Sequence, residues 1–291
     1  MKTFLTTVLL SAAVLGASSC GGASSAANNR SSIQNKGSDT LVNVAQAWAE
    51  AYREVNADIA VAVSGGGSGT GISAMMNGTV DIANASRKMK EKEIALAKKN
   101  GIEPIEFIVG YDALAVYVHK DNPIESITIA QLADIYGENG QTTKWSQLGV
   151  TLPDGVDDEI IRVSRQNNSG TFAYFRDAVL GKGNNYKLGS VDMHGSKDVV
   201  ETVHKTPSAI GYSGLAYATD EVRMVPVSTD GGAPVVPSVA TASDRTYPIA
   251  RPLFMYTAGQ PAGAVKEYMD WILSAAGQKI IEEKGYAPVM Q

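Results

Sequence analysis

The sequence is poor in the side chains on which disulfides, metal centres and many active sites depend. Its 291 residues include one cysteine, Cys20, and three histidines, His119, His194 and His204. A single cysteine has no disulfide partner within the chain. The histidines lack the spacing of a metal site and are expected to be surface or structural residues. The sequence therefore predicts neither a bound metal nor a cofactor.

Positive charge is scarce as well. The chain carries 25 Lys and Arg against 30 Asp and Glu, which gives a formal net charge of −5 at pH 7. This balance argues against nucleic acid or an anionic membrane surface as the main partner. Any anion site in such a protein must work through local dipoles and hydrogen bonds. An acidic cluster at Asp154, Asp157, Asp158 and Glu159 is expected to be a solvated loop, with a cation site as the alternative.

Long apolar runs are absent beyond the N-terminus. The run Phe4–Leu15 follows Lys2 and is too short to span a bilayer, which needs about 20 residues. With the small residues before Cys20, it resembles a bacterial lipoprotein signal, in which the cysteine carries the lipid. We expect residues 1–19 to be a signal peptide, Cys20 to be lipidated, as with palmitate, and 20–30 to be a flexible tether. An ordinary secretory signal is the alternative.

The rest of the chain favours an α/β architecture. It is long enough for two domains, and short apolar runs alternate with amphipathic helices. The expected strands are near Ile33 and at Ile59–Val63, Val80–Ala85, Ile105–Val109, Leu114–Val118, Ile160–Ser164, Ile210–Tyr212, Arg223–Val227 and Leu253–Tyr256. The expected helices are Thr40–Asn56, Thr70–Asn77, Glu91–Asn100, Ile129–Tyr136, Thr171–Val179, Lys197–Lys205, Ala262–Leu273 and Gly277–Lys284. We expect loops at 181–196 and 229–243.

Three segments rich in Ser, Thr and Gly stand at expected strand-to-helix junctions. They are Gly37–Thr40, Ser64–Gly71 and Arg165–Thr171. A helix N-terminus offers unpaired N–H groups and partial positive charge, glycines allow close approach, and hydroxyls add donors. Three such segments, the last led by an arginine, predict one small oxyanion held from several sides. A capped helix without ligand is the alternative for the first segment, and a flexible linker for the second.

The second and third segments differ in what they add. Ser64–Gly71 lacks the lysine of a Walker A loop and fits neither the dinucleotide nor the serine-hydrolase pattern. Arg165 can donate two parallel hydrogen bonds to an oxyanion. A further pair, Ser86 and Arg87, follows an expected strand and is a candidate for the same site. A solvated strand end is the alternative for Arg87.

Taken together, these motifs resemble the substrate-binding protein of bacterial ABC-type phosphate uptake, in the type II periplasmic-binding-protein superfamily. The resemblance covers nearly all of the chain after the signal. It rests on Gly37–Leu41, Gly67–Gly71, Gly78–Arg87, Arg165 with Ser169–Thr171, and Tyr247–Leu253. It implies two α/β domains joined by a hinge of two crossing strands, near Leu114–Val118 and Ala250–Tyr256. Domain one would comprise 31–115 plus 251–291, and domain two 116–250.

The resemblance also implies a set of ligand-binding residues. Some relatives have an aspartate where this chain has Ser86-Arg87, and that aspartate accepts a hydrogen bond from protonated phosphate. We expect Asp112 to be the acceptor here, with a hinge-capping carboxylate as the alternative. Carried over to this sequence, the phosphate ligands would be Thr40, Leu41 through its backbone, Ser68, Arg165, Ser169, Gly170 and Thr171, with Ser86, Arg87 and Asp112 added.

The implied function is capture without chemistry, so the protein is not expected to be an enzyme. The two domains would close on phosphate, and a permease pair with a cytoplasmic ATPase would receive it. The protein would act as a monomer in the periplasm or on the outer face of the cell membrane, held there by its lipid alone. A receptor for another tetrahedral oxyanion such as sulfate, a phosphatase-like enzyme, and an adhesion or scaffold protein without anion affinity are the alternatives.

Overall fold

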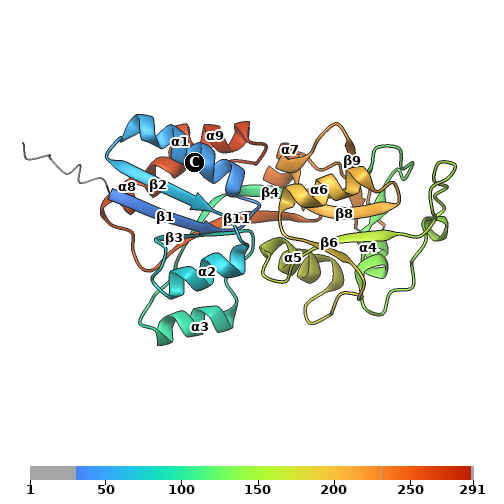
Figure 1. Cartoon of the computed structure of the whole chain (residues 1–291), viewed down its shortest axis with the longest axis horizontal. Helices are drawn as coiled ribbons and strands as arrows, with labels where there is room; N and C mark the ends of the chain where they lie inside the picture. The colour runs from blue at the N-terminus through green and yellow to red at the C-terminus, as the bar shows by residue number, and fades with distance from the viewer. Residues whose placement is uncertain (1–30, 230, 290–291) are drawn as a thin grey trace, which may run out of the picture.

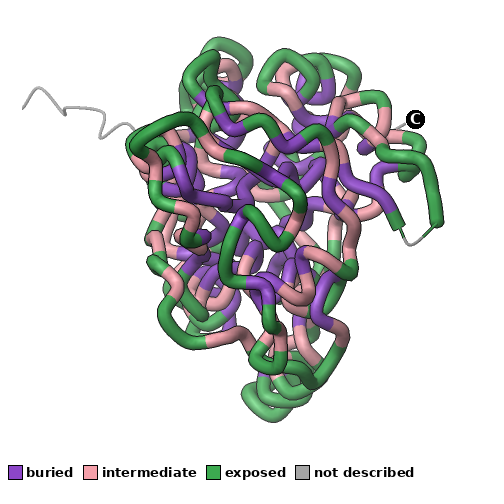
Figure 2. The backbone as a smooth tube through the Cα atoms, turned by 90° about the vertical axis from the view of Figure 1, so that its right-hand side faces the viewer, coloured by how far each residue is buried: buried purple, intermediate pink, exposed green. Residues whose placement is uncertain are grey.

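The computed structural model of the protein describes residues 31–229 and 231–289, and it confirms the α/β class. The predicted signal peptide, Cys20 and the tether lie outside these residues. Nine strands form one curled sheet in the order β2-β1-β3-β11-β4-β8-β6-β7, with β9 paired to β4 (Figure 1). The buried backbone runs through the middle of the molecule (Figure 2). Every helix in the described ranges is too short or too polar to cross a membrane.

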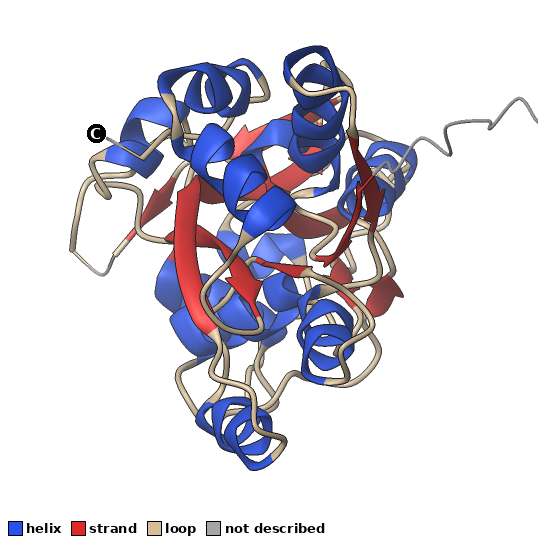
Figure 3. Cartoon of the chain, turned by 90° about the vertical axis from the view of Figure 1, so that its left-hand side faces the viewer, coloured by secondary structure: helices blue, strands red, loops and turns tan. Residues whose placement is uncertain are grey.

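The first half of the sheet is built on three parallel strands. β1 (Ser31–Gly37) lies between β2 (Ile59–Ser64) and β3 (Ile82–Ala85), with β11 (Ala250–Thr257) antiparallel beside β3. Helices cover both faces of these strands (Figure 3). One face carries α1 (Val42–Val55), α8 (Gly263–Leu273) and α9 (Ala275–Glu283), and the other carries α2 (Ser68–Met76) and α3 (Glu91–Lys99).

Alternation along β3 explains this two-sided packing. Ile82 packs in the cluster that contains Trp48 of α1, whereas Ala83 and Ala85 pack with Ile72 of α2. Successive side chains of a strand point to opposite faces, so a strand that is buried on both faces is expected to be mostly apolar, and β3 is apolar except for Asn84. Because β1, β2 and β3 are parallel, their carboxyl ends meet at one edge of the sheet, where each strand passes through a short loop into a helix.

The second half has the same construction. β6 (Ile161–Arg165) is parallel to β7 (Val191–Met193) and β8 (Ala209–Gly214), and β9 (Val222–Val225) pairs with β4. The helices are α4 (Ile129–Tyr136), α5 (Gly170–Phe175), α6 (Ser196–Lys205) and α7 (Val239–Ser243), with a π-helical turn at Arg176–Leu180 and 3-10 turns at Trp145–Leu148 and Leu215–Tyr217. β5 (Ile127–Thr128) and β10 (Val227–Ser228) form a separate small sheet.

One long strand, β4 (Ile105–His119), runs through both halves. It pairs with β11 up to Ala113 and with β8 from Leu114. The prediction of two strands separated by Gly110-Tyr111-Asp112 was therefore wrong. Gly110 serves packing, because a Cβ there would lie 2.3 Å from the Ile281 side chain. The strand remains extended through the residues that separated the two predicted strands.

Two predicted loops also contain regular structure. β7 lies within the expected loop 181–196, and only three residues pair with β6, two of them exposed. α7 lies at the end of the expected loop 229–243 and is capped by Ser238, whose side chain accepts a hydrogen bond from Thr241 N. Both elements are too short for hydrophobic periodicity to reveal them.

Candidate functional site

The hydroxyls of the predicted loops lie together in the interior. Ser38 Oγ donates to Ser86 Oγ over 3.0 Å, and Ser68 Oγ lies 3.4 Å from Ser86 Oγ. Thr40 Oγ1 is 3.0 Å from Thr171 Oγ1, across 131 residues of sequence. All five side chains are buried. Buried hydroxyls carry a desolvation cost unless they are hydrogen-bonded, so this concentration marks a built polar site.

The loops meet because the two halves of the sheet face each other at their loop-bearing edges. Gly69 N donates to Asn168 O over 3.0 Å, and Asn168 Nδ2 donates to Gly66 O over 3.0 Å. These bonds connect the start of α2 with the loop before α5. Ser169 caps α5, since its Oγ accepts hydrogen bonds from the amides of Thr171 and Phe172.

Gly170 is the point of closest approach between the halves. A Cβ at this position would lie 2.2 Å from Ser68 Oγ and 2.6 Å from Ser86 Oγ. Any side chain here would push the two loops apart. The residue therefore lies at the centre of the hydroxyl cluster, and its lack of a side chain is what allows α5 to approach.

Arg165 is buried and held in place by the backbone of its own half. Its guanidinium donates to His194 O over 2.7 Å and to Ser196 Oγ over 3.0 Å, and Nη2 forms an ion pair with Asp39 Oδ2 at 3.0 Å. Burial lowers the pKa of Arg165, and Asp39 opposes that shift. The ion pair crosses from the start of α1 to β6 and so joins the two halves.

A second buried guanidinium, Arg251 of β11, was missing from the predicted site. It forms an ion pair with Asp112 at 2.7 Å in which neither side chain is exposed. It also donates to Thr171 Oγ1 over 3.1 Å and to Thr40 Oγ1 over 3.2 Å. The motif Tyr247–Leu253 had pointed to this segment, but nothing in its local pattern assigned the arginine to the hydroxyls.

Asp112 lies beside the hydroxyl cluster, with its oxygens already engaged. Oδ2 accepts from Arg251, and Oδ1 accepts from Leu215 N over 3.2 Å. Burial raises the pKa of Asp112, and the Arg251 guanidinium counteracts this shift. Asp39 is a second carboxylate near the cluster, because its Oδ1 accepts from Gly66 N over 2.9 Å while Oδ2 pairs with Arg165.

Two predicted site residues point their donors elsewhere. Arg87 forms a pair of 2.8 Å hydrogen bonds to Glu93 and another to Lys88 O, so its guanidinium faces α3. The alternative of a solvated strand end does not describe it either, since Arg87 is buried. The amide of Leu41 donates to Ser38 O over 3.1 Å, within the turn that opens α1.

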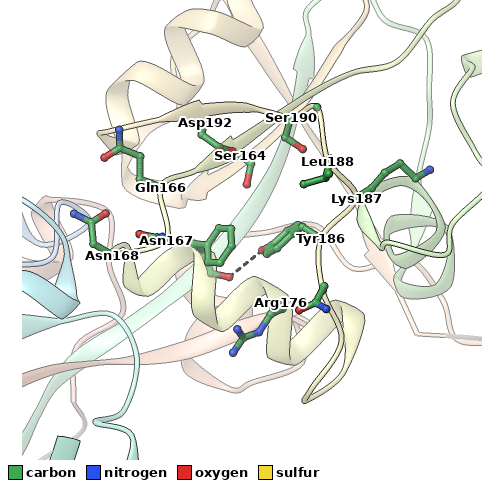
Figure 4. Close-up of a pocket in the computed structure, with 13 residues that line it drawn as sticks. Ser164, Gln166, Asn167, Asn168, Arg176, Tyr186, Lys187, Leu188, Ser190 and Asp192 are labelled. Carbon is green, nitrogen blue, oxygen red and sulfur yellow. Dashed lines mark hydrogen bonds between the residues drawn. The ribbon is translucent and has the colours of Figure 1, made fainter.

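A polar pocket of about 720 Å³ lies on the outer side of the third loop (Figure 4). Asn167, Asn168 and Tyr186 are among its lining residues, and Tyr186 donates a hydrogen bond to Phe172 O over 2.9 Å. None of the clustered hydroxyls or buried guanidiniums lines it. The pocket is therefore distinct from the predicted oxyanion site.

The chemistry of the cluster suits an oxyanion. Hydroxyl groups can donate to an oxyanion, and each of the two guanidiniums is paired with a carboxylate, so binding there would depend on hydrogen bonds more than on net charge. Within the described ranges, no group of three His, Cys, Asp or Glu residues is arranged to hold a metal ion. In the acidic cluster, Asp158 accepts hydrogen bonds from the amide and hydroxyl of Ser146.

Comparison with known proteins agrees with this chemistry. The model of the PBP superfamily domain matches residues 22–276. The phosphate-binding protein PstS of Pseudomonas aeruginosa is 33% identical over 269 residues, which cover 88% of this chain and 83% of that protein. The chain belongs to the phosphate-binding protein family of the PBP superfamily. Another relative is protein SphX of Synechococcus elongatus, 35% identical over 91% of this chain and 79% of that protein.

Solved structures of this phosphate-binding family share the fold. A structure from Clostridium perfringens, described as a phosphate ABC transporter substrate-binding protein with bound phosphate, has a TM-score of 0.79 at 30% identity and covers 89% of this chain and all of that one. An ABC-type phosphate transport receptor from Vibrio cholerae has a TM-score of 0.68 at 26% identity, with coverage of 88% and 99%. The predicted family and fold are thereby confirmed.

Proposed function

We propose that this protein binds inorganic phosphate among the buried hydroxyls of Thr40, Ser68 and Thr171, as the receptor of an ABC transporter. The observation that carries the proposal is the convergence of these hydroxyls with Arg251 between the two halves of the sheet, where Arg165 also pairs with Asp39 across the same boundary. The phosphate-binding relatives and the phosphate-bound neighbour support the same ligand.

The proposed mechanism is capture by closure. Residues 31–115 with 251–291 would form one domain and 116–250 the other, with β4 and β11 as the hinge. Fixed donors from both domains would replace the water around the anion, and the closed form would be recognised by a permease pair with its ATPase. Lipidation of Cys20 would hold a monomeric receptor on the outer face of the membrane and raise its effective concentration near the permease.

Selectivity for phosphate over sulfate would depend on a carboxylate that accepts the proton of hydrogen phosphate. Asp112 is our candidate because it is buried beside Thr40 and Arg251. Asp39, which accepts from Gly66 N and pairs with Arg165, is the carboxylate used for comparison. Asp112→Asn should weaken phosphate binding and spare or improve sulfate binding, while Asp39→Asn should leave the ratio of the two affinities unchanged. An unchanged ratio in Asp112→Asn would remove Asp112 from this role.

The experiment that tests the function is isothermal titration of the purified protein with phosphate, sulfate and arsenate. We expect phosphate to bind most tightly. Arg165→Ala should abolish binding, because the residue supplies a cation and fixes the third loop through His194 and Asp39. Tight binding of sulfate alone would assign the protein to another oxyanion. Absence of heat with all three anions would leave a scaffold that keeps the fold without the function.

A further inference from the structure

A groove of about 760 Å³ lies between the two halves, next to the hydroxyl cluster. One wall is the segment 87–92, which leads into the first residues of α3, and the other comes from α5 and the turn after it, with β11 as the floor. Figure 1 shows α3 and α5 on the same side of the sheet, one in each half. The groove therefore lies where the halves would separate during opening.

The walls of this groove are basic, although the protein as a whole is acidic. Four lysines line it: Lys88, Lys90, Lys92 and Lys182. The carboxylates among its lining residues are Glu91 and Asp177, and Asp177 is already paired with Arg176 at 2.7 Å. Partial burial lowers the pKa of Lys90 most, and the nearby Arg87 lowers it further. Glu93 acts in the opposite direction, and Lys92 and Arg176 make smaller contributions that again lower the pKa. Lys88 forms an ion pair with Glu106 at 3.8 Å and Arg87 with Glu93 at 2.8 Å, so the positive charge crowded here is carried mainly by Lys90, Lys92 and Lys182.

The groove reaches the site through two side chains. Tyr174 lines the groove, and the Arg251 guanidinium lies 5.7 Å from the centre of its ring on the inner side. Arg87 also lines the groove, and its Nη2 lies 3.7 Å from where a Cβ of Gly69 would be, at the start of α2. The groove and the buried hydroxyls are therefore separated by about one layer of side chains.

We infer that this basic groove is the entry route for the anion, in which Lys88, Lys90, Lys92 and Lys182 raise the local concentration of phosphate before it passes between Arg87 and Tyr174. The inference rests on the proposed phosphate binding. A cleft lined by one sign of charge focuses the field and accelerates association of an opposite charge. None of the four lysines donates to the buried hydroxyls, so they should affect arrival and not retention.

The test compares two quadruple variants of the protein that lose the same charge. The groove variant replaces Lys88, Lys90, Lys92 and Lys182 by glutamine. The control variant replaces four exposed lysines of α6 and α9, or adjacent to α9, by glutamine: Lys197, Lys205, Lys279 and Lys284. Dissociation of ³²P-phosphate is timed after a chase with unlabelled phosphate, and Kd is measured by equilibrium dialysis. The association rate constant is the dissociation rate constant divided by Kd.

We expect the groove variant to associate more slowly by on the order of tenfold at low salt, with its dissociation rate unchanged. The difference should shrink as the ionic strength rises from about 0.01 M to about 1 M, where the screening length falls from about 30 Å to about 3 Å. The control variant should associate at nearly the wild-type rate.

Three outcomes would overturn the entry route while phosphate binding stands. They are equal association rates in groove variant and wild type, equal slowing in both variants, and a change confined to dissociation. Wild-type protein that binds no phosphate would instead refute the proposed function itself.

Discussion

Replacement of Gly170 by alanine should prevent tight anion binding while the protein still folds. The new Cβ would lie 2.2 Å from Ser68 Oγ and 3.0 Å from Ser68 Cβ, whereas ordinary contacts begin at 3.4 Å. Interiors are close-packed, so α5 and its loop would have to retreat by about 1 Å. Each half of the sheet can tolerate that movement by itself, because the collision occurs between them.

The size of the effect follows from the bonds that this retreat would break. Thr171 Oγ1 is 3.0 Å from Thr40 Oγ1 and accepts from Arg251 over 3.1 Å. An added 1 Å takes both beyond hydrogen-bonding distance. A neutral bond contributes about 1 kcal/mol and one to a charged group about 1.5–3 kcal/mol. Because phosphate would be held by the same displaced hydroxyl and guanidinium groups, we expect a loss of similar size in its binding free energy, and Kd should rise by about 10²–10³-fold, at 1.4 kcal/mol for each factor of ten.

Calorimetry separates this effect from unfolding. The free energy of unfolding of Gly170→Ala, measured without phosphate, should fall by no more than the roughly 2.5–4 kcal/mol that those two bonds contribute, so the variant should remain folded. Gly69→Ala provides a graded comparison, since its Cβ would lie 3.2 Å from Asn168 O and needs only a small adjustment. A Gly170→Ala protein that binds phosphate within about threefold of wild type would refute the reasoning.

Two further predictions concern the ion pairs. Arg251→Met should reduce the free energy of unfolding by about 3–5 kcal/mol in urea denaturation, because it leaves Asp112 buried and unpaired. Asp112→Leu combined with Arg251→Met should recover part of that loss, and a double variant no more stable than the single one would contradict this account. Burial acts to raise the pKa of Glu93, but hydrogen bonds from Arg87 and Lys90 hold that pKa below its ordinary 4.5. The carboxylate therefore stabilises the fold above that pH, and the stability is lost as the pH falls through the lowered pKa. Glu93→Gln should be most destabilising near neutral pH and nearly silent at the acid end of a pH series of urea unfolding curves, and a pH-independent difference would contradict the assignment.

Much of the fold could be predicted from the sequence because its elements are strongly patterned. Helix α1 buries Val44, Trp48 and Tyr52 at helical spacing, and its observed range falls within the predicted one. The parallel strands β1 and β3 carry their loops to one edge, so the meeting of the first loop with Ser86 follows from strand direction alone. The third loop was grouped with the first two by its Ser, Thr and Gly content and its leading arginine, and the resemblance to phosphate-binding proteins assigned it to the other domain.

The ion pairs could not be predicted in this way. Arg251 meets Asp112 across 139 residues, and Arg165 meets Asp39 across 126 residues. Such pairs leave no periodic signal, because they are fixed by packing and not by local conformation. Arg87 is the opposite case, because its partner lies only six residues away in the sequence and was still not predicted. Its place after β3 indicated a ligand, while Glu93 in the first turn of α3 was close enough in sequence to have been considered as its partner.

The central claim is that segments from both halves donate to one tetrahedral anion. A crystal structure of the protein soaked with arsenate, read from anomalous scattering at the arsenic edge, tests it most directly. The account predicts a single arsenic peak whose oxygens lie about 3 Å from the hydroxyls of Thr40 and Ser68 and from the guanidinium of Arg165. A peak confined to one half of the molecule, or to the pocket of Figure 4, would contradict it.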